Sequence, residues 1–195
     1  SALTISKSLP KNSGTVIVKH ANPCGVSINK NTLKSYQLAL ACDPVSAFGG
    51  IVSCNYRVNK ILAMKLNNIF LEVIIANGFD PEALKILKKK KNLRLIDAAN
   101  FTMQNLVNFN SANEAILTQS EDLEKFNIKN FKIVSKKKPN ISQLKNLIFA
   151  FNICRYVKSN AIVLASQETT VGIGSGQPSR LDSCQIAIDK MKKFQ

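Results

Sequence analysis

The sequence contains no tryptophan, a single histidine and no apolar run long enough to cross a membrane. A spanning helix needs about 20 consecutive apolar residues, so the sequence predicts no membrane segment and no membrane partner. Its five cysteines are odd in number and form no Cys-x-x-Cys pair, which argues against the disulfide framework of a secreted protein. We therefore expect a cytoplasmic protein whose cysteines serve as small buried apolar side chains.

Acidic residues are also scarce, because 12 Asp and Glu stand against 27 Lys and Arg, for a formal net charge of +15. Such an excess can indicate nucleic-acid binding. However, only 4 of the basic residues are Arg, and Lys (23), Asn (21) and Ile (20) are raised together, as AT-rich codons produce. The lysine runs at 88–91 and 136–138 contain no aromatic residue that could stack on bases. We interpret them as solvated surface and expect no nucleic-acid partner.

With 195 residues and a hydrophobic fraction of 45%, the chain can bury a core, and its patterns alternate between strand and helix. The first part predicts strands at 15–18, 51–54 and 73–76, a turn at 22–25, and helices over 33–41, 60–70 and 81–90. Alternating strands and helices are typical of a layered α/β sheet.

The second part is irregular between residues 97 and 140, where we expect a connecting region, and regular after it. There the pattern predicts a helix capped by Ser142, buried strands at 161–165 and 170–173, and a final helix. The apolar face expected for the final helix consists of Leu181, Cys184, Ile188 and Met191.

Lys19 and His20 stand side by side at the end of a predicted strand. Adjacent side chains of a strand point to opposite faces, so the two can share a cleft only because the strand ends there. An ammonium next to an imidazole could combine charge stabilisation with a general base. The alternative interpretation is a surface lysine beside a structural histidine, and the residue types leave it open.

The segment 43–50 reads DPVSAFGG. Its paired glycines allow a ligand to come close to the backbone, and Phe48 offers a ring for stacking on a flat heterocycle; the alternative is a packed turn with Phe48 in the core. Glu72 is an unusual carboxylate just before an apolar strand. It marks the edge of the sheet or accepts hydrogen bonds from ligand amides.

The glycine-rich segment 172–177 lies between a predicted strand and a predicted helix. Backbone N–H groups at a helix N-terminus favour phosphate, and Arg180 could clamp it. The segment lacks both the Lys-Ser/Thr of a P-loop and the final glycine of the dinucleotide fingerprint. Asn160 precedes the strand at 161–165, at the same end of the sheet, and can both donate and accept hydrogen bonds.

Six motifs together resemble the transformylase part of the AICAR transformylase/IMP cyclohydrolase family. They occur in the family's order and cover most of the chain between residues 18 and 187: VKHANPCGV (18–26), DPVSAFGGI (43–51), FLEVIIA (70–76), KKNLRLI (90–96), VKSNAIV (157–163) and GIGSGQPSRLDSCQIA (172–187). The resemblance implies a cytidine-deaminase-like, layered α/β/α fold. It also implies one such subdomain over 1–125 and the start of a second over 126–195.

The activity implied by the resemblance is formyl transfer from the co-substrate 10-formyltetrahydrofolate to the 5-amino group of AICAR, 5-aminoimidazole-4-carboxamide ribonucleotide, giving FAICAR. By family match, Lys19 and His20 are the catalytic pair. The AICAR contacts fall on five positions: Phe48, Gly49, Glu72, Asn160 and Arg180. The resemblance further implies a homodimer whose active sites use residues of both chains.

The same fold in zinc deaminases needs His-x-Glu and Pro-Cys-x-x-Cys, whereas this sequence reads His20-Ala21-Asn22 and has Ser27 at the second cysteine position. We therefore expect no catalytic metal. The family's cyclohydrolase domain and the segment lining its folate site have no counterpart in the sequence, so we expect a fragment of the bifunctional enzyme. An alternative of another class is a non-catalytic basic binding or scaffold module with the same fold.

Overall fold

The computed structural model describes residues 1–102, 107–120 and 128–194 of the chain. They form two compact units, one of Ser1–Asn100 with Pro139–Gln195 and one of Phe101–Lys138. The helices of the first unit are α1 (Ala2–Ser8), α2 (Thr32–Cys42), α3 (Lys60–Asn67), α4 (Pro81–Leu87), α5 (Ile141–Cys154) and α6 (Arg180–Phe194). None of these helices is long and apolar enough to cross a membrane.

A seven-stranded sheet is the centre of the first unit, with the order β5-β4-β3-β1-β2-β9-β8. Its strands are β1 (Gly14–Lys19), β2 (Asn22–Ile28), β3 (Gly50–Cys54), β4 (Leu71–Ala76), β5 (Arg94–Asp97), β8 (Ile162–Ser166) and β9 (Thr169–Gly174). Strands β3, β4 and β5 are parallel, and the other neighbours are antiparallel. The sheet is therefore mixed.

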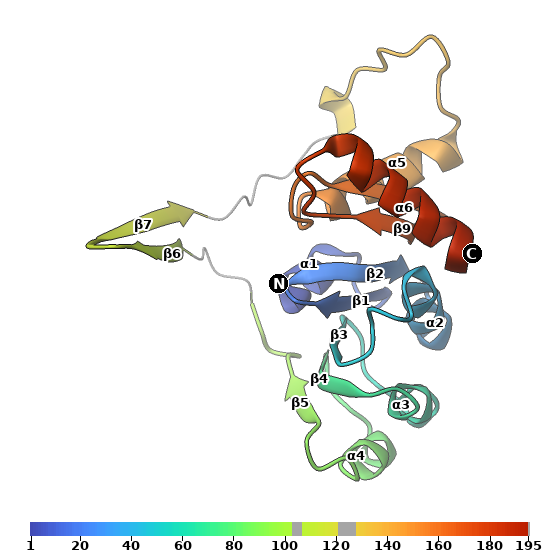
Figure 1. The fold of residues 1–195 in the computed structure, drawn as a ribbon. Helices are drawn as coiled ribbons and strands as arrows, with labels where there is room; N and C mark the ends of the chain where they lie inside the picture. The colour runs from blue at the N-terminus through green and yellow to red at the C-terminus, as the bar shows by residue number, and fades with distance from the viewer. Residues whose placement is uncertain (103–106, 121–127, 195) are drawn as a thin grey trace. The chain divides into compact units, whose positions relative to one another are not determined.

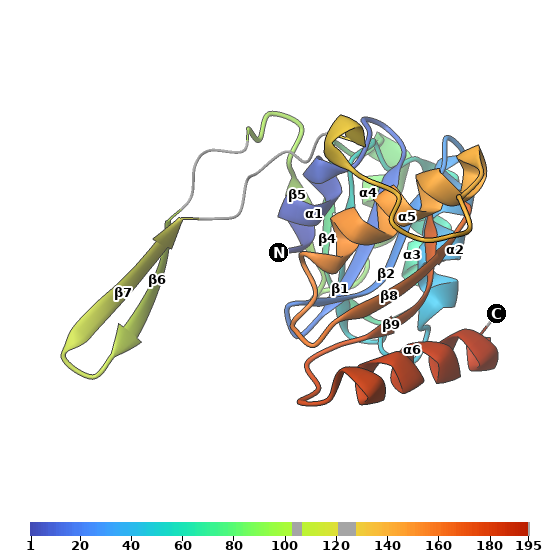
Figure 2. The same ribbon diagram turned by 90° about the horizontal axis from the view of Figure 1, so that it is seen from above.

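Helices cover both faces of this sheet (Figure 1, Figure 2). Helices α2, α3, α4 and α6 lie along one face, where Ile17, Val52 and Ile74 are buried against the first three of them. On the other face, α1 and α5 pack against Val16 and Val26. Because neighbouring residues of β1 face opposite layers, both faces of the strand are apolar. The predicted layered α/β/α fold is confirmed.

The expected turn at 22–25 is wrong, because these residues belong to β2. The chain reverses over only His20 and Ala21, whose φ angles are 52° and 67°, as in the two-residue turns that join antiparallel strands. Pro23 is tolerated inside β2 because the ladder with β1 shifts register there, and β2 pairs with β9 only at Ser27.

Three further expectations need correction. Asn140, not Ser142, caps α5, since its side chain accepts from the Gln143 backbone N–H and the two residues form a capping box. Strand β8 is half-buried rather than buried. The buried residues of α6 are Ser183 and Ala187, whereas the expected core residue Leu181 is 80% exposed.

The small face of α6 follows from the glycines of β9. A Cβ atom added at Gly172 or Gly174 would overlap a backbone carbonyl oxygen of α6, at Ala187 and Ser183 respectively. Helix and strand thus approach more closely than larger side chains allow. An apolar-periodicity argument selects the largest side chains, which this contact excludes.

The second unit contains a hairpin of β6 (Val107–Ala112) and β7 (Ala115–Ser120), followed by the single turn η1 (Ile128–Asn130). Every residue of the two strands is exposed, and the sequence analysis did not predict them. The boundary expected between residues 125 and 126 lies outside the described residues. Among the described residues, β8 and β9 extend the sheet formed by the first hundred residues.

Candidate active site

The predicted site residues converge on one edge of the sheet. Strands β1 and β9 end at this edge, and β2, β3, β4 and β8 begin there, as their parallel and antiparallel registers require. Lys19 is the last residue of β1, and Glu72 is the second residue of β4. The topology therefore brings together residues that are more than fifty positions apart in the sequence.

Lys19 is held by the loop that precedes β3. Its Nζ donates to the carbonyl oxygen of Phe48 at 2.8 Å and to that of Gly49 at 2.9 Å. A lysine ammonium has three N–H donors, so these two bonds leave the third for an acceptor on a ligand. The first of the predicted catalytic side chains is thereby fixed against two of the predicted substrate-binding positions.

Gly49 is required at its position for two reasons. Its φ of +67° is a conformation that other residues adopt only with strain. In addition, a Cβ atom there would lie 2.6 Å from Lys19 Nζ, so any side chain would displace the ammonium. The backbone N–H of Gly49 donates to the Phe70 carbonyl oxygen at 2.8 Å, which fixes the loop to the residue before β4.

Phe48 is not in the core, because 62% of its surface is exposed. Its ring centroid lies 5.3 Å from that of Phe70, with the planes tilted by 45°, and Phe70 is itself 47% exposed. Two exposed aromatic rings beside a fixed ammonium form a surface on which a flat heterocycle could stack. The packed-turn interpretation of Phe48 is wrong.

Glu72 lies in an interior strand, so the sheet-edge interpretation of this carboxylate is also wrong. Gly50 pairs with Leu71 and Ile51 pairs with Val73, which leaves Glu72 as the extra residue of a β-bulge. Bulges turn a side chain away from its regular direction and are frequent next to active sites. Glu72 is exposed, and its carboxylate could accept hydrogen bonds from ligand amides.

His20 is exposed at the tip of the turn between β1 and β2. Its positive φ is uncommon for a residue with a side chain and carries strain. The sequence analysis expected partial burial of this imidazole, which the structure does not show. The exposed position leaves both ring nitrogens accessible to a ligand at the sheet edge.

Asn160 organises the glycine-rich segment at the same edge. Its Nδ2 donates to the carbonyl oxygens of Gln177, at 2.9 Å, and Pro178, at 2.8 Å. Its own carbonyl oxygen accepts from the Ser183 hydroxyl at 2.7 Å. The amide N–H groups are thus used within the protein, and Asn160 could meet a ligand only through Oδ1. Arg180, the first residue of α6, is exposed beside this segment.

The two groups of residues are connected through Asn22, directly after the β1–β2 turn. Its Oδ1 accepts from the Lys158 backbone N–H at 3.0 Å, and the Lys158 carbonyl oxygen accepts from Gly176 N–H at 2.8 Å. The turn that carries His20 is therefore tied to the segment that carries Asn160. Sequence reasoning assigned no role to Asn22, although it follows His20 by only two positions.

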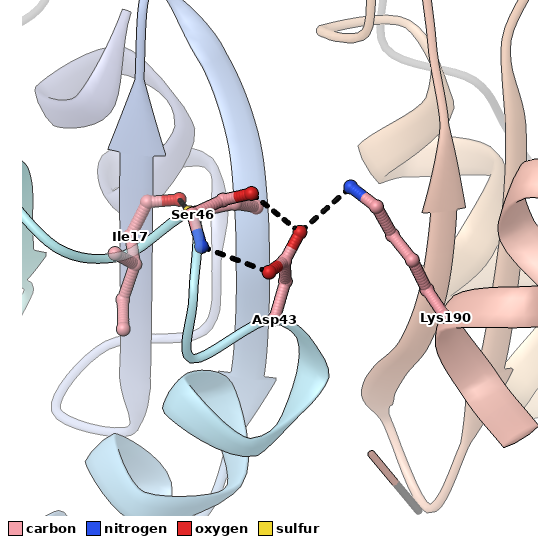
Figure 3. Close-up of polar contacts among 5 residues, drawn as sticks. Ile17, Asp43, Ser46 and Lys190 are labelled. Carbon is pink, nitrogen blue, oxygen red and sulfur yellow. Dashed lines mark hydrogen bonds and ion pairs between the residues drawn. The ribbon is translucent and has the colours of Figure 1, made fainter. Parts of the chain in front are cut away.

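Asp43 lies at the start of the loop that holds Lys19. Its side chain is only 3% exposed, and Lys190 Nζ of α6 lies 2.6 Å from its Oδ2 (Figure 3). Ser46 donates to the carboxylate from its backbone N–H at 2.9 Å and from its hydroxyl at 2.7 Å. Burial alone would raise the pKa of Asp43, but the bonds from Lys190 and Ser46 outweigh it and hold the pKa below its ordinary value.

The cysteines near this loop are unsuited to nucleophilic or metal chemistry. Burial, reinforced by the nearby Asp43, raises the pKa of the Cys24 thiol to about 12, and burial raises that of Cys42 to about 11. Both are therefore protonated thiols at neutral pH. Within residues 1–102, 107–120 and 128–194, no group of three or more His, Cys, Asp and Glu side chains could hold a metal ion.

A profile of the family described as "AICARFT/IMPCHase bienzyme" matches residues 1–190, nearly the whole chain. The chain belongs to this family. The AICARFT/IMPCHase membership agrees with the six motifs and confirms the resemblance on which the site residues were chosen. It does not test the role of any individual side chain.

Individual relatives match almost the full chain but only part of their own length. The bifunctional purine biosynthesis protein PurH of Leptospira biflexa is 42% identical over 193 residues, which are 98% of this chain and 37% of that protein. PurH of Persephonella marina is 44% identical over 92% of this chain and 35% of its own length. PurH of Aquifex aeolicus is 39% identical over 100% and 38%. The chain spans little more than a third of these curated relatives.

Three residues of the site escaped the sequence analysis. Phe70 could have been found, because an aromatic residue directly before a buried strand is placed at the sheet edge. Asp43 could have been found from the Asp-x-x-Ser spacing, which is typical of a side chain that caps the following turn. Lys190 gave no signal, because nothing in the sequence relates it to a residue 147 positions earlier.

Proposed function

We propose that the chain serves purine biosynthesis as the AICAR-binding part of a formyltransferase, which transfers the formyl group of 10-formyltetrahydrofolate to AICAR. The observation that carries the proposal is the Lys19 ammonium, fixed by the carbonyl oxygens of Phe48 and Gly49 beside His20. Family membership supports the same reaction, since the relatives are named as bifunctional purine biosynthesis proteins.

In this reaction the 5-amino nitrogen of AICAR attacks the formyl carbon, and a new C–N bond forms as the bond to N10 of the folate breaks. The amine is a poor nucleophile because its lone pair is delocalised into the ring and the carboxamide. His20 takes the amine proton, acting through the carboxamide, and the folate nitrogen leaves with a proton. Lys19 directs its remaining N–H to the formyl oxygen, where negative charge develops.

The other residues orient the nucleotide. Phe48 and Phe70 stack on the imidazole, and the exposed carboxylate of Glu72 accepts from amino or amide hydrogens of AICAR. The glycine-rich segment and Arg180 bind an anionic group such as the phosphate. The homodimer and the folate site belong to this proposal, because the chain spans about a third of its relatives.

The test is a formyl-transfer assay with AICAR and 10-formyltetrahydrofolate on the wild-type chain and on Lys19→Ala and His20→Ala. Loss of a general base typically costs about 10² to 10⁴ in rate, and we expect His20→Ala to fall in this range. Lys11→Ala is the control, because Lys11 is exposed near the opposite edge of the sheet, where β1 begins.

A His20→Ala rate within a few-fold of wild type would overturn the proton-transfer role. A wild-type chain that neither transfers formyl nor shows a thermal shift with AICAR, yet binds DNA in a salt-sensitive manner, would favour the basic binding module instead.

A further inference from the structure

The carboxylate of Asp43 joins two parts of the molecule that both reach the site. Asp43 is the residue that ends α2, and Lys190 lies in the last two turns of α6. Their 2.6 Å ion pair is accompanied by the two bonds from Ser46, so the carboxylate has three hydrogen-bond donors. Figure 3 shows Lys190 reaching from α6 towards the carboxylate between the two elements.

The loop that begins at Asp43 leads directly to the acceptors of Lys19. The Asp43 carbonyl oxygen accepts from Ala47 N–H at 3.2 Å, and the Ala47 carbonyl oxygen accepts from Gly50 N–H at 3.0 Å. Between these contacts stand Phe48 and Gly49, whose carbonyl oxygens bind Lys19 Nζ. A continuous chain of hydrogen bonds therefore runs from the ion pair to the ammonium.

The positive charge of Lys190 matters because the carboxylate is almost fully buried. A buried charge without a partner is costly, and Cys24 and Cys42, the other titratable groups acting on Asp43, are protonated thiols. Ser46 alone would supply hydrogen bonds but no compensating charge. Without Lys190, the carboxylate would gain by moving towards water, and the loop that starts at Asp43 would move with it.

We propose that the Asp43–Lys190 ion pair is a positioning device, which holds the loop 43–50 in the conformation that presents the Phe48 and Gly49 carbonyl oxygens to Lys19. The pair touches no substrate and acts through the loop. Its consequence for formyl transfer depends on the proposed function, whereas its effect on Lys19 does not. It also makes α6, whose first residue is Arg180, a part that sets the geometry of the lysine.

The positioning role is tested by the reactivity of Lys19 towards a limiting amount of acetic anhydride, with acetylation of each lysine quantified by peptide mass spectrometry. In the wild-type chain, an ammonium bonded to two carbonyls reacts slowly compared with the exposed Lys34. In Lys190→Ala we expect Lys19 to react about tenfold faster, the size expected when charge-assisted hydrogen bonds are lost. Lys190→Arg should restore most of the protection.

Lys192→Ala is the matched control, since it removes an exposed lysine from the same helix and should leave Lys19 unchanged. Asp43→Asn is the second variant, in case Lys190→Ala fails to fold, which would appear as faster reaction of every lysine. The Asn side chain still accepts from Ser46 but lacks the charge, so it should release Lys19 in part.

Unchanged Lys19 reactivity in folded Lys190→Ala or Asp43→Asn would overturn the positioning role. In the formyl-transfer assay, we expect Lys190→Ala to lower kcat about tenfold with a smaller change in the KM for AICAR, because Lys19 acts on charge that develops in the transition state. If the wild-type chain lacks transfer while Lys190→Ala still releases Lys19, the proposed function fails and the positioning role stands.

Discussion

At the scale of single residues, the site depends on contacts that short motifs only partly encode. The sequence predicted that Lys19 and His20 stand where a strand ends, and that Phe48 and Gly49 lie on a ligand-lining loop. It could not predict that the Lys19 ammonium binds the carbonyl oxygens of that loop, 29 and 30 residues further along the chain. Such a contact is fixed by the register of β1 with β3, which no local pattern reveals.

Substitution Gly49→Ala tests whether this contact matters. The new methyl group would strain the positive φ and lie 2.6 Å from Lys19 Nζ, and a misplacement of about 1 Å can cost about 100-fold in rate. We expect a loss of that order in formyl transfer. Gly78→Ala is the control, because Gly78 also has a positive φ and its Cβ would lie 2.6 Å from a basic side chain, that of Arg57, outside the site.

Equal loss of activity in both glycine variants would show that backbone strain, and not the displacement of Lys19, is responsible. Unfolding measured with urea separates the two effects, since both variants should lose about 1–2 kcal/mol of stability from the strained φ.

Asp43 gives a pH-dependent prediction for stability. Because its pKa in the folded protein is lowered, with the bonds from Lys190 and Ser46 outweighing burial, the carboxylate contributes stability above its unfolded pKa of about 3.9. That contribution disappears as the pH falls through the folded pKa. Asp43→Asn should therefore lose about 1–3 kcal/mol at pH 7 and progressively less towards pH 3, as followed by urea unfolding.

Asp189→Asn, which changes an exposed carboxylate of α6 next to Lys190, should leave stability at pH 7 nearly unchanged. A loss in Asp43→Asn that is as large at pH 3 as at pH 7 would mean that the charge of Asp43 is not the source of its contribution.

At the scale of elements, strand and helix types were predictable where apolar periodicity is regular, and failed where glycine and proline have other uses. Pro23 and Gly25 look like turn residues, but Gly25 is there because a Cβ would overlap the Ala39 carbonyl oxygen of α2. The β6–β7 hairpin has no buried residue, so it leaves no apolar alternation in the sequence. Hydrophobic patterns report burial, and neither case depends on burial.

The contact between β9 and α6 can be tested at Gly174. A methyl group there would overlap the Ser183 carbonyl oxygen, which forces the helix away from the sheet, and overpacking of this kind costs about 3 kcal/mol. At Gly176, whose φ is +69°, a methyl group meets nothing within 4 Å, so Gly176→Ala should lose only about 1 kcal/mol. Urea unfolding that ranks the two variants in the opposite order would contradict this close packing.

At the scale of the whole molecule, the fold class followed from the sequence because alternating strands and helices permit few layered solutions. The site as a whole followed from the family resemblance. Composition and periodicity alone left Lys19, Phe48 and Glu72 with ordinary structural alternatives. The structure removes the core interpretation of Phe48 and the sheet-edge interpretation of Glu72, because it shows an exposed ring and a bulge in an interior strand.

The most direct measurement is a titration of the isotope-labelled chain with AICAR, followed by the backbone amide resonances. The account predicts shifts at the sheet edge that carries the site, at His20, Gly49 and Gly176, and none near Ser13 or Asn29 at the opposite edge. Shifts confined to the opposite edge, or no shifts at saturating AICAR, would contradict the claim that this edge binds the nucleotide.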